Sequence, residues 1–485
     1  MCIGRFVICT YTQPMVRSTS YRIPRVILSG LRGGSGKTIL SLCILSMLKE
    51  RNLKVIPFKK GPDFIDAGWL SLSAKGDCYN LDLFMMSSDV VMKSFISHTK
   101  GADIAIIEGN RGLYDGMDSK GTYSTAGLAK ILKSPVIIVV DCSKVTTTIS
   151  AMILGCMRFD PDVNIRGVLL NNLANKRQES VIRDAITERC AIPVLGAIPR
   201  FKDNPLPERH MGLTPFHEHR ELENAIERIR SVSERYIDVD SVLKIARDAE
   251  PLIFDKQDSG FKTHGRQFRI GIIRDSAFQF YYPENIEELQ KMGALLVEIS
   301  AVNEGRLPHI DALYIGGGFP ETHAHILSEN TGFRGSLKDA IEKGLPVYAE
   351  CGGLMYLGRE LIMDNKRYPM VGALPLIFKV EDKPQAHGYT IVEVERENPY
   401  FSKGVILRGH EFHYSHVIDG RWDDVYLAFR LKRGKGIKDG MDGICYKNVL
   451  ATYTHLHALG SPEWVNGMIK VCGLKTSVLP LASLD

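Results

Sequence analysis

The sequence lacks several features that would place it in a specialised class of protein. Its ten cysteines include no C-x-x-C pair and follow no regular spacing, which argues against a zinc site or a disulfide framework and favours buried thiols in a reducing cytoplasm. The apolar run over residues 2–11 is interrupted by Arg5 and is too short to span a bilayer. There is no block of lysine and arginine, and the net charge is only +5. We therefore predict a cytoplasmic protein with no membrane or nucleic-acid partner.

The length of 485 residues is too great for one hydrophobic core and predicts two or three domains. No internal repeat or low-complexity tract is present. From composition and pattern we predict an N-terminal extension (1–21), a P-loop domain (22–245), a linker (246–267), a second α/β domain (268–475) and a C-terminal tail (476–485).

The chain is organised around residues 24–48, where a β-branched strand leads through a glycine-rich loop into an apolar helix. The loop reads GLRGGSGKT, and its backbone N–H groups around Gly33, Gly34 and Gly36 suit the phosphates of a nucleotide. Lys37 would reach the β- and γ-phosphates, and the Thr38 hydroxyl would bind Mg²⁺. The spacing is one residue longer than the common P-loop. A plain linking turn is the alternative, but strand, Lys-Thr pair and helix together predict an ATP or GTP site.

Two further strands of this domain are predicted to end in charged side chains. The strand over residues 55–58 leads into a loop that carries two lysines and two aspartates: Lys59, Lys60, Asp63 and Asp66. The carboxyl end of a parallel strand is where α/β sheets bind ligands, although taken alone this loop reads equally well as a solvated turn. The apolar strand over residues 102–109 ends at Glu108, a position that brings a carboxylate to Mg²⁺ opposite a P-loop.

The remaining pattern of the first domain predicts a doubly wound parallel sheet. Apolar strands are expected at residues 135–141, 165–171 and 192–200, with helices between them. Asn171, at the end of its strand, is either a contact to the adenine edge or a simple turn residue. From about residue 222 the sequence predicts a closing helix that runs into a polar linker.

The second domain carries a predicted nucleophile. Residues 347–357, VYAECGGLMYL, read as a strand, a sharp turn at Cys351 and a helix, which is the layout of a nucleophile elbow whose helix N-terminus favours the thiolate. The required base is either His455 or His457 in ATYTHLHALG, and the turn in YIGGG offers a second set of N–H groups for an oxyanion. The other histidines, such as His410, are interpreted as ordinary surface or core residues. The pattern predicts acyl transfer through a thioester.

An ATP site joined to a Cys-His hydrolytic site indicates glutamine-dependent amidation. The motifs are G-x5-GKT, KKGPDFID, the strand of Glu108 with GLYDG, GVLLN, IPVLGAIPR, LPERHMGL, YIGGGFPE, AECGGLMYL and TYTHLH. With these motifs the sequence closely resembles the cobyrinic acid a,c-diamide synthases, relatives of dethiobiotin synthetase and cobyric acid synthase, over residues 24–473. The resemblance implies an α/β fold in which a dethiobiotin synthetase-like P-loop domain precedes a class I glutamine amidotransferase-like domain.

The resemblance also implies an activity and roles for residues. Two amidations, dependent on ATP and L-glutamine, would modify the a and c acetate side chains of a cobalt or nickel tetrapyrrole. By position, Lys37 and Thr38 would bind ATP and Mg²⁺, while Asp63 and Glu108 would hold Mg²⁺ and the substrate carboxylate. Cys351 would be the nucleophile, and His455 matches the histidine of the family's T-Y-x-H. Like relatives in this branch, the chain has no H-x-E at His455 or His457 to complete the usual triad. The loop with Lys59, Lys60 and Asp63 would read the carboxylate.

Two departures from the family pattern concern the substrate. SGLRGGSGKT and KKGPDFIDAGW differ from the usual A-G-T-x-S-G-V-G-K-T and GPDYIDP, and they favour Ni-sirohydrochlorin, on the route to coenzyme F430 in methanogens, over cobyrinate on the route to cobalamin. Two alternatives are a ParA/MinD-like ATPase switch, although Arg32 replaces that family's lysine, and an enzyme like cobyric acid synthase that acts on other side chains. The oligomeric state is left open, with a homodimer as one possibility.

Overall fold

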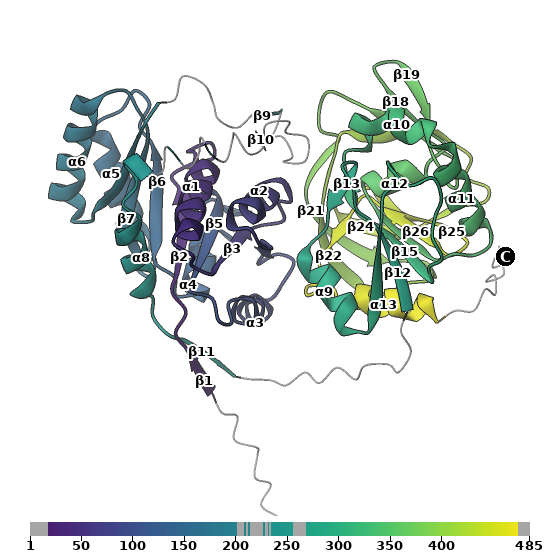
Figure 1. Cartoon of the computed structure of the whole chain (residues 1–485), viewed down its shortest axis with the longest axis horizontal. Coiled ribbons are helices and arrows are strands. Elements are labelled where there is room, and N and C mark those ends of the chain that lie inside the picture. Colours follow the sequence, from purple (N-terminus) through teal and green to yellow (C-terminus); the bar gives the residue numbers. More distant parts are fainter. Residues whose placement is uncertain are drawn as a thin grey trace, which may run out of the picture.

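The computed structural model describes residues 18–200, 208–209, 212–213, 227, 231, 234–255 and 268–473. The first 17 residues of the predicted extension, most of the predicted closing helix, the polar linker from residue 256 and the C-terminal tail lie outside the described residues. Two α/β units lie side by side, with the first unit on the left of Figure 1 and the second on the right. The predicted fold class is confirmed.

The first unit is a doubly wound parallel sheet of seven strands in the order β4-β3-β5-β2-β6-β7-β8. Helices α1, α2 and α8 pack their apolar side chains on one face of the sheet, and α3, α4, α5 and α6 pack on the other. The predicted strands are present, and the short strand β4 was not predicted. The strands are β2 (Arg25–Gly30), β3 (Val55–Lys60), β4 (Tyr79–Leu81), β5 (Ile104–Gly112), β6 (Val136–Asp141), β7 (Ile165–Leu173) and β8 (Val194–Pro199). The helices are α1 (Lys37–Glu50), α2 (Ile65–Ala74), α3 (Ser88–His98), α4 (Thr125–Ile131), α5 (Thr148–Phe159), α6 (Lys176–Cys190) and α8 (Val239–Arg247).

The second unit is built on a mixed sheet of ten strands in the order β14-β12-β15-β17-β26-β25-β24-β21-β22-β27. Its first five strands are parallel, and the rest are antiparallel. The parallel strands are β12 (Phe268–Ile273), β14 (Ala294–Ile299), β15 (Ala312–Ile315), β17 (Val347–Glu350) and β26 (Val449–Thr452). The antiparallel strands are β21 (Ala386–Val394), β22 (Ile406–His413), β24 (Tyr426–Arg433), β25 (Met441–Tyr446) and β27 (His455–Leu456).

Smaller elements complete the second unit. A sheet of four strands, in the order β19-β18-β20-β23, consists of β18 (Glu360–Met363), β19 (Lys366–Pro369), β20 (Leu376–Val380) and β23 (Ser415–Gly420). A pair of short strands, β13 (Phe278–Phe280) and β16 (Gly317–Gly318), lies next to the site described below. The helices are α9 (Pro283–Lys291), α10 (Ala324–Glu329), α11 (Thr331–Glu342), α12 (Gly352–Leu357) and α13 (Pro462–Cys472).

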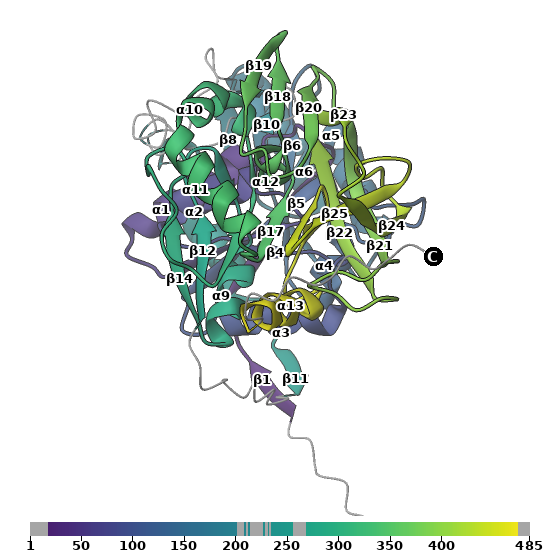
Figure 2. The same ribbon diagram turned by 90° about the vertical axis from the view of Figure 1, so that its right-hand side faces the viewer.

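A two-stranded sheet joins the segments on either side of the first unit. β1 (Ser18–Tyr21) pairs antiparallel with β11 (Leu252–Asp255), and Figures 1 and 2 show the pair at the bottom of both views. These residues belong to the predicted extension and the predicted linker. The pairing has a core contact as well, because the side chain of Leu252 is buried against the first unit. The start and the end of this unit therefore lie together.

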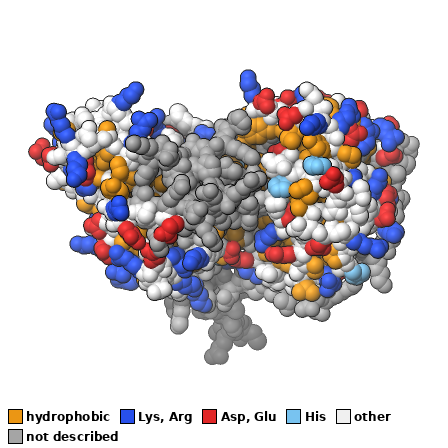
Figure 3. Space-filling view, turned by 45° about the horizontal axis from the view of Figure 1, so that its top comes forward, with side chains coloured by type: hydrophobic (Ala, Val, Ile, Leu, Met, Phe, Trp, Pro, Cys, Tyr) orange, Lys and Arg blue, Asp and Glu red, His pale blue; other side chains and the backbone are white. Residues whose placement is uncertain are grey.

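The surface is mixed in charge. On the face shown in Figure 3, acidic and basic side chains are interspersed over both units, as expected from the small net charge. Among the described helices, none is both long enough and apolar enough to cross a membrane.

Candidate active site

The glycine-rich loop connects β2 to α1, and Lys37 is the first residue of that helix. Gly34 and Gly36 have φ angles of +72° and +89°, which only glycine adopts readily. A Cβ atom at position 36 would also lie 2.1 Å from Nδ2 of Asn171. That amide donates a hydrogen bond of 3.1 Å to the carbonyl of Ser35. Asn171 therefore holds the phosphate loop, and its predicted contact to adenine stays a prediction.

A buried carboxylate lies behind this loop. Thr38 Oγ1 donates a hydrogen bond of 2.9 Å to Glu108 Oε1, and Lys59 Nζ lies 2.6 Å from the same oxygen. Lys59 also lies 2.5 Å from Asp66 Oδ2. Burial lowers the pKa of Lys59, but the charges of Asp66 and Glu108 outweigh burial and hold it well above its ordinary value. The lysine is thus a charged partner for two carboxylates, and its predicted contact to substrate stays a prediction.

Two of the three residues predicted to bind Mg²⁺, Thr38 and Glu108, lie together and carry oxygen atoms that suit this ion. Glu108 is 1% exposed, and within the described residues its Oε2 atom is buried without a hydrogen-bond partner. Next to it stands the Thr38 hydroxyl, and carboxylate and hydroxyl oxygens are the ligands that Mg²⁺ takes. Burial and the neighbouring charge of Asp66 raise the pKa of Asp63 to about 7. A nearby cation would favour the ionised form of this carboxyl.

A cavity of about 600 Å³ lies between the two units and is lined by both. The first unit contributes Lys60, Asp63 and Arg111, and the second contributes Cys351 and His455. The predicted substrate residues Lys60 and Asp63 therefore share one space with the predicted thiol nucleophile.

Cys351 stands on a strained turn between β17 and α12. Its φ and ψ angles are +48° and −98°, a conformation that costs a non-glycine residue free energy and is typical of a nucleophile elbow. Its backbone N–H donates to the carbonyl of Thr452, and its Sγ lies 3.7 Å from the carbonyl of Phe412. Burial raises the pKa of the Cys351 thiol above its ordinary value, and Glu321 raises it further, while the Gly352 N–H lowers it by less. The N–H at the start of α12 thus favours thiolate as expected, while burial acts against it, and the predicted thiolate stays a prediction.

The two glycine turns predicted to supply oxyanion donors approach each other. A Cβ atom on Gly352 would lie 3.0 Å from the backbone nitrogen of Gly318 in β16. Backbone N–H groups so placed beside a nucleophile can stabilise a tetrahedral oxyanion.

His455 has a carboxylate partner that the sequence analysis missed. Its Nδ1 atom lies 3.3 Å from Oε2 of Glu350, and the other oxygen of Glu350 accepts a hydrogen bond from Leu456 N. No H-x-E begins at His455 or His457, and the residue before Cys351 takes the place of that glutamate. Glu350 immediately precedes Cys351 in AEC, but it is the parallel pairing of β17 with β26, with Glu350 in register with Thr452, that brings it to the segment of His455. The arrangement is a Cys-His-Glu set, although no hydrogen bond joins Cys351 to His455 among the described residues.

The other histidines of the region divide into two groups. His457 is fully buried, does not line the cavity, and has its Nε2 atom 3.5 Å from Glu284 Oε1. His410 does line the cavity: its ring stacks on that of His455, with centroids 4.9 Å apart. Burial, and then His455, lower its pKa well below the ordinary value. His410 is therefore a buried residue, as one of the two interpretations had it, and the pairing of β22 with β27 brings it to His455.

Comparisons with known proteins agree with this division of the chain. Residues 26–213 match the CobQ/CobB/MinD/ParA nucleotide binding domain, and residues 269–463 match the CobB/CobQ-like glutamine amidotransferase domain. The chain is 42% identical to the cobyrinate a,c-diamide synthase of Magnetococcus marinus over 449 residues, 92% of this chain and 96% of that protein. It is 40% identical to that of Archaeoglobus fulgidus over 452 residues, 92% and 97% of the two chains. A crystal structure of a glutamine amidotransferase covers 42% of this chain and 99% of its own, with 17% identity and a TM-score of 0.32.

Proposed function

The chain belongs to the cobyrinate a,c-diamide synthase family, and from this premise we propose that it amidates the a and c acetate side chains of cobyrinate. It is an ATP-dependent amidating ligase with a glutamine amidotransferase domain. The observation that carries the proposal is the cavity shared by Cys351, His455, Lys60 and Asp63. Ammonia released at the thiol would enter the same space in which a carboxylate is activated.

The glutaminase half follows from the Cys-His-Glu set. His455 takes the proton of the Cys351 thiol as sulfur attacks the carboxamide carbon of glutamine. The N–H groups of Gly318 and Gly352 bind the oxyanion. The C–N bond then breaks, His455 passes its proton to the leaving nitrogen, and ammonia departs. Water hydrolyses the thioester to glutamate. Glu350 holds the imidazole by Nδ1 and stabilises its positive charge.

The ATP half makes the carboxylate reactive. A carboxylate resists attack by ammonia because its oxygen is a poor leaving group, and transfer of the γ-phosphoryl group to that oxygen gives an acyl phosphate. Lys37 stabilises charge on the transferred group, and Lys59 holds Glu108 in place. Thr38, Asp63 and Glu108 are the residues that would hold Mg²⁺, which supplies further positive charge at the phosphates when it is bound. Ammonia then displaces phosphate to form the amide.

Two macrocycles, cobyrinate and Ni-sirohydrochlorin, are candidates for the substrate. Both relatives above are named for cobyrinate, whereas the departures in the loops around Lys37 and Asp63 favour Ni-sirohydrochlorin. Purified protein should be incubated with each tetrapyrrole, MgATP and glutamine, and the products analysed by mass spectrometry. We expect two successive amide products from cobyrinate, with a transient monoamide. A product amidated at other side chains would instead support an activity like that of cobyric acid synthase.

The ParA/MinD-like switch considered as an alternative has no support from the match over most of the chain. Such a switch would not release glutamate from glutamine, and it has no counterpart to the second unit with Cys351. Glutaminase activity therefore separates the two. The Mg²⁺ requirement, the cytoplasmic location and a homodimer stay predictions, to be tested by chelation, fractionation and light scattering.

A further inference from the structure

A phenylalanine of the first unit reaches the glutaminase site of the second. The Phe64 ring stacks on that of Phe280, with centroids 5.2 Å apart and an angle of 4° between the planes. Its centroid lies 4.4 Å from that of Tyr282 and 5.3 Å from that of His455. It also lines the cavity with Cys351. The proposed base is therefore in direct contact with a side chain from the ATP unit.

The position of Phe64 is set by the loop that carries Asp63. Phe64 is the residue before α2. The loop that precedes it is hydrogen-bonded to the side chain of Asn80 in β4. Asn80 Nδ2 donates hydrogen bonds of 2.8 Å to the carbonyl of Gly61 and 3.1 Å to the carbonyl of Asp63. The ring of Phe64 is therefore attached to the same loop as the Asp63 carboxyl group.

On the other side, Phe64 touches two parts of the glutaminase. The ring centroid of His455 lies 5.3 Å from that of Phe64 and 4.9 Å from that of His410. Phe280 belongs to β13, where it is in register with Gly317 of β16, the strand of the oxyanion turn. A Cβ atom on Gly317 would lie 2.5 Å from Cε1 of His455. The imidazole and the oxyanion turn are thus packed tightly together, and Phe64 lies against the imidazole and against Phe280, the residue paired with that turn.

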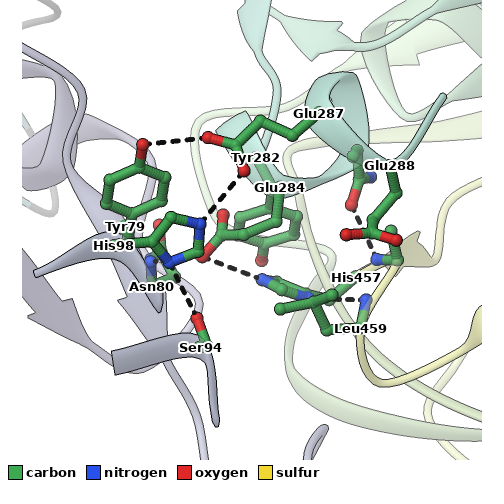
Figure 4. Close-up of polar contacts among 12 residues, drawn as sticks. Tyr79, Asn80, Ser94, His98, Tyr282, Glu284, Glu287, Glu288, His457 and Leu459 are labelled. Carbon is green, nitrogen blue, oxygen red and sulfur yellow. Dashed lines mark hydrogen bonds and ion pairs between the residues drawn. The ribbon is translucent and has the colours of Figure 1, made fainter. Parts of the chain in front are cut away.

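A cluster of polar contacts around α9 holds the units together near this point. Glu287 accepts a hydrogen bond of 2.9 Å from the Tyr79 hydroxyl and lies 3.0 Å from His98 Nε2. Glu284 Oε1 accepts from Asn80 N at 3.3 Å and lies 3.5 Å from His457 Nε2. Figure 4 shows these side chains facing one another from the two units.

Helix α9 is in turn bound to the segment that carries the base. Asn285 Nδ2 donates to the carbonyl of Leu456, and Asn285 Oδ1 accepts from Ala458 N at 2.7 Å. The segment of His455 therefore has two connections to the first unit, one through Phe64 and one through Asn80 and Glu284.

We propose that Phe64 is a positioning residue for the glutaminase, which holds His455 in place for proton transfer and makes glutamine hydrolysis depend on the state of the loop 61–66. The positioning role rests on the ring contacts alone. The dependence on loop state rests on the proposed function, because it requires a ligand in the ATP unit. Its consequence is that ammonia is released when the first unit is occupied.

The test compares Phe64→Ala, Phe64→Leu and Phe64→Tyr with the wild type in full-length protein. Glutamate release is measured with glutamine alone and with MgATP plus cobyrinate. For Phe64→Ala we expect kcat to fall roughly tenfold to a hundredfold, with KM for glutamine little changed, because a displaced base affects proton transfer more than binding. The response to MgATP and cobyrinate should also be lost. Phe64→Tyr, which keeps the ring, should restore both.

A matched control removes an interface contact that does not touch His455. Tyr79→Phe loses the hydrogen bond to Glu287 and should keep the wild-type kcat and response. Melting temperatures show whether each variant folds. If Phe64→Ala does not fold, the comparison is made with Phe64→Leu, which keeps more of the apolar volume.

Three outcomes would overturn the proposal. The first is a wild-type kcat and a wild-type response to MgATP and cobyrinate in both Phe64→Ala and Phe64→Leu, and the second is a fall in kcat in Tyr79→Phe equal to that in Phe64→Ala. The third is an amidation rate in Phe64→Ala that falls equally with glutamine and with ammonium chloride as nitrogen source. If the wild type amidates no tetrapyrrole, the proposed function fails, yet the assay with glutamine alone still decides the positioning role.

Discussion

Oε2 of Glu350 lies 3.3 Å from Nδ1 of His455, and Glu350 is the residue before the Cys351 nucleophile. Both residues are 2% exposed at their side chains. The carboxylate also accepts a hydrogen bond of 3.1 Å from the Tyr314 hydroxyl. One turn of the chain therefore supplies the nucleophile and the group that orients its base.

Replacing Glu350 by glutamine tests this relationship. The amide keeps the shape but removes the charge that stabilises the imidazolium, and losing a charge-assisted hydrogen bond costs about 1.5–3 kcal/mol, roughly tenfold to a hundredfold in rate. We expect glutaminase kcat to fall by that factor, while amidation from ammonium chloride is retained. Glu360→Gln, at an exposed ion pair with Arg367, serves as the control. Wild-type glutaminase in Glu350→Gln would contradict the orienting role.

Cys351→Ser is expected to abolish glutamine-dependent amidation and to leave synthesis from high ammonium chloride largely intact, because the nucleophile and the P-loop lie in separate units. His455→Ala should behave in the same way. His457→Ala removes a contact to Glu284 away from the cavity and should retain more glutaminase activity. Steady-state rates with each nitrogen source check this, and a loss confined to His457→Ala would show that the base is wrongly assigned.

The two glycines of the phosphate loop form a matched pair. Gly36→Ala places a Cβ atom 2.1 Å from Asn171 Nδ2 in a left-handed conformation, whereas a Cβ atom at Gly33 meets nothing within 4 Å. We expect Gly36→Ala to lower the free energy of unfolding of the nucleotide-free protein by about 1–3 kcal/mol and to weaken ATP binding. Gly33→Ala should leave the unfolding free energy nearly unchanged. Thermal denaturation and nucleotide titration measure both, and equal stability in the two variants would contradict the close approach to Asn171.

Asp63 makes stability depend on pH. Its folded pKa, raised to about 7 mainly by burial, lies above the ordinary value of 3.8. Between these values the unfolded chain ionises Asp63 and the folded chain does not, so folding loses stability as pH rises from about 4 to 7. Asp63→Asn should therefore raise Tm at pH 7 in the absence of nucleotide, with a gain that disappears toward pH 4. Asp382→Asn, at an exposed position, is the control. A gain independent of pH would show that Asp63 is not responsible.

Formation of an acyl phosphate has an isotopic signature. Tetrapyrrole labelled with ¹⁸O in its acetate carboxylates should transfer one label to the released phosphate for each amide, with ADP as co-product. Mass spectrometry of the phosphate measures this transfer. Label in AMP, with pyrophosphate as co-product, would indicate adenylation and refute the step.

Sequence patterns predicted those parts of the site that are local in the chain. The P-loop and the elbow of Cys351 are each one strand, one turn and one helix, so glycine positions and hydrophobic pattern are sufficient to identify them. Glu350 is adjacent to Cys351 but acquires its role from a residue 105 positions away. Its function therefore depends on the pairing of β17 with β26, which no local pattern encodes.

The positions of Phe64 and His410 at the site could not be predicted either, because they also depend on tertiary contacts. Phe64 reaches His455 across the boundary between the units, and His410 does so through the register of β22 with β27. The burial that raises the pKa of the Cys351 thiol also depends on the complete fold, which the local pattern of strand, turn and helix does not describe. Among strands, β4 has three residues, too few for a reliable periodic signal.

The antiparallel pairing of β1 with β11 has a consequence for how the domain arrangement of such proteins can evolve. Because the two strands run in opposite directions side by side, the first unit is entered and left at the same place on its surface. A partner module can be joined there through either chain end, or encoded by a separate gene, without rethreading the sheet. The pairing thus allows the ATP unit to be joined by recombination to different ammonia-producing domains.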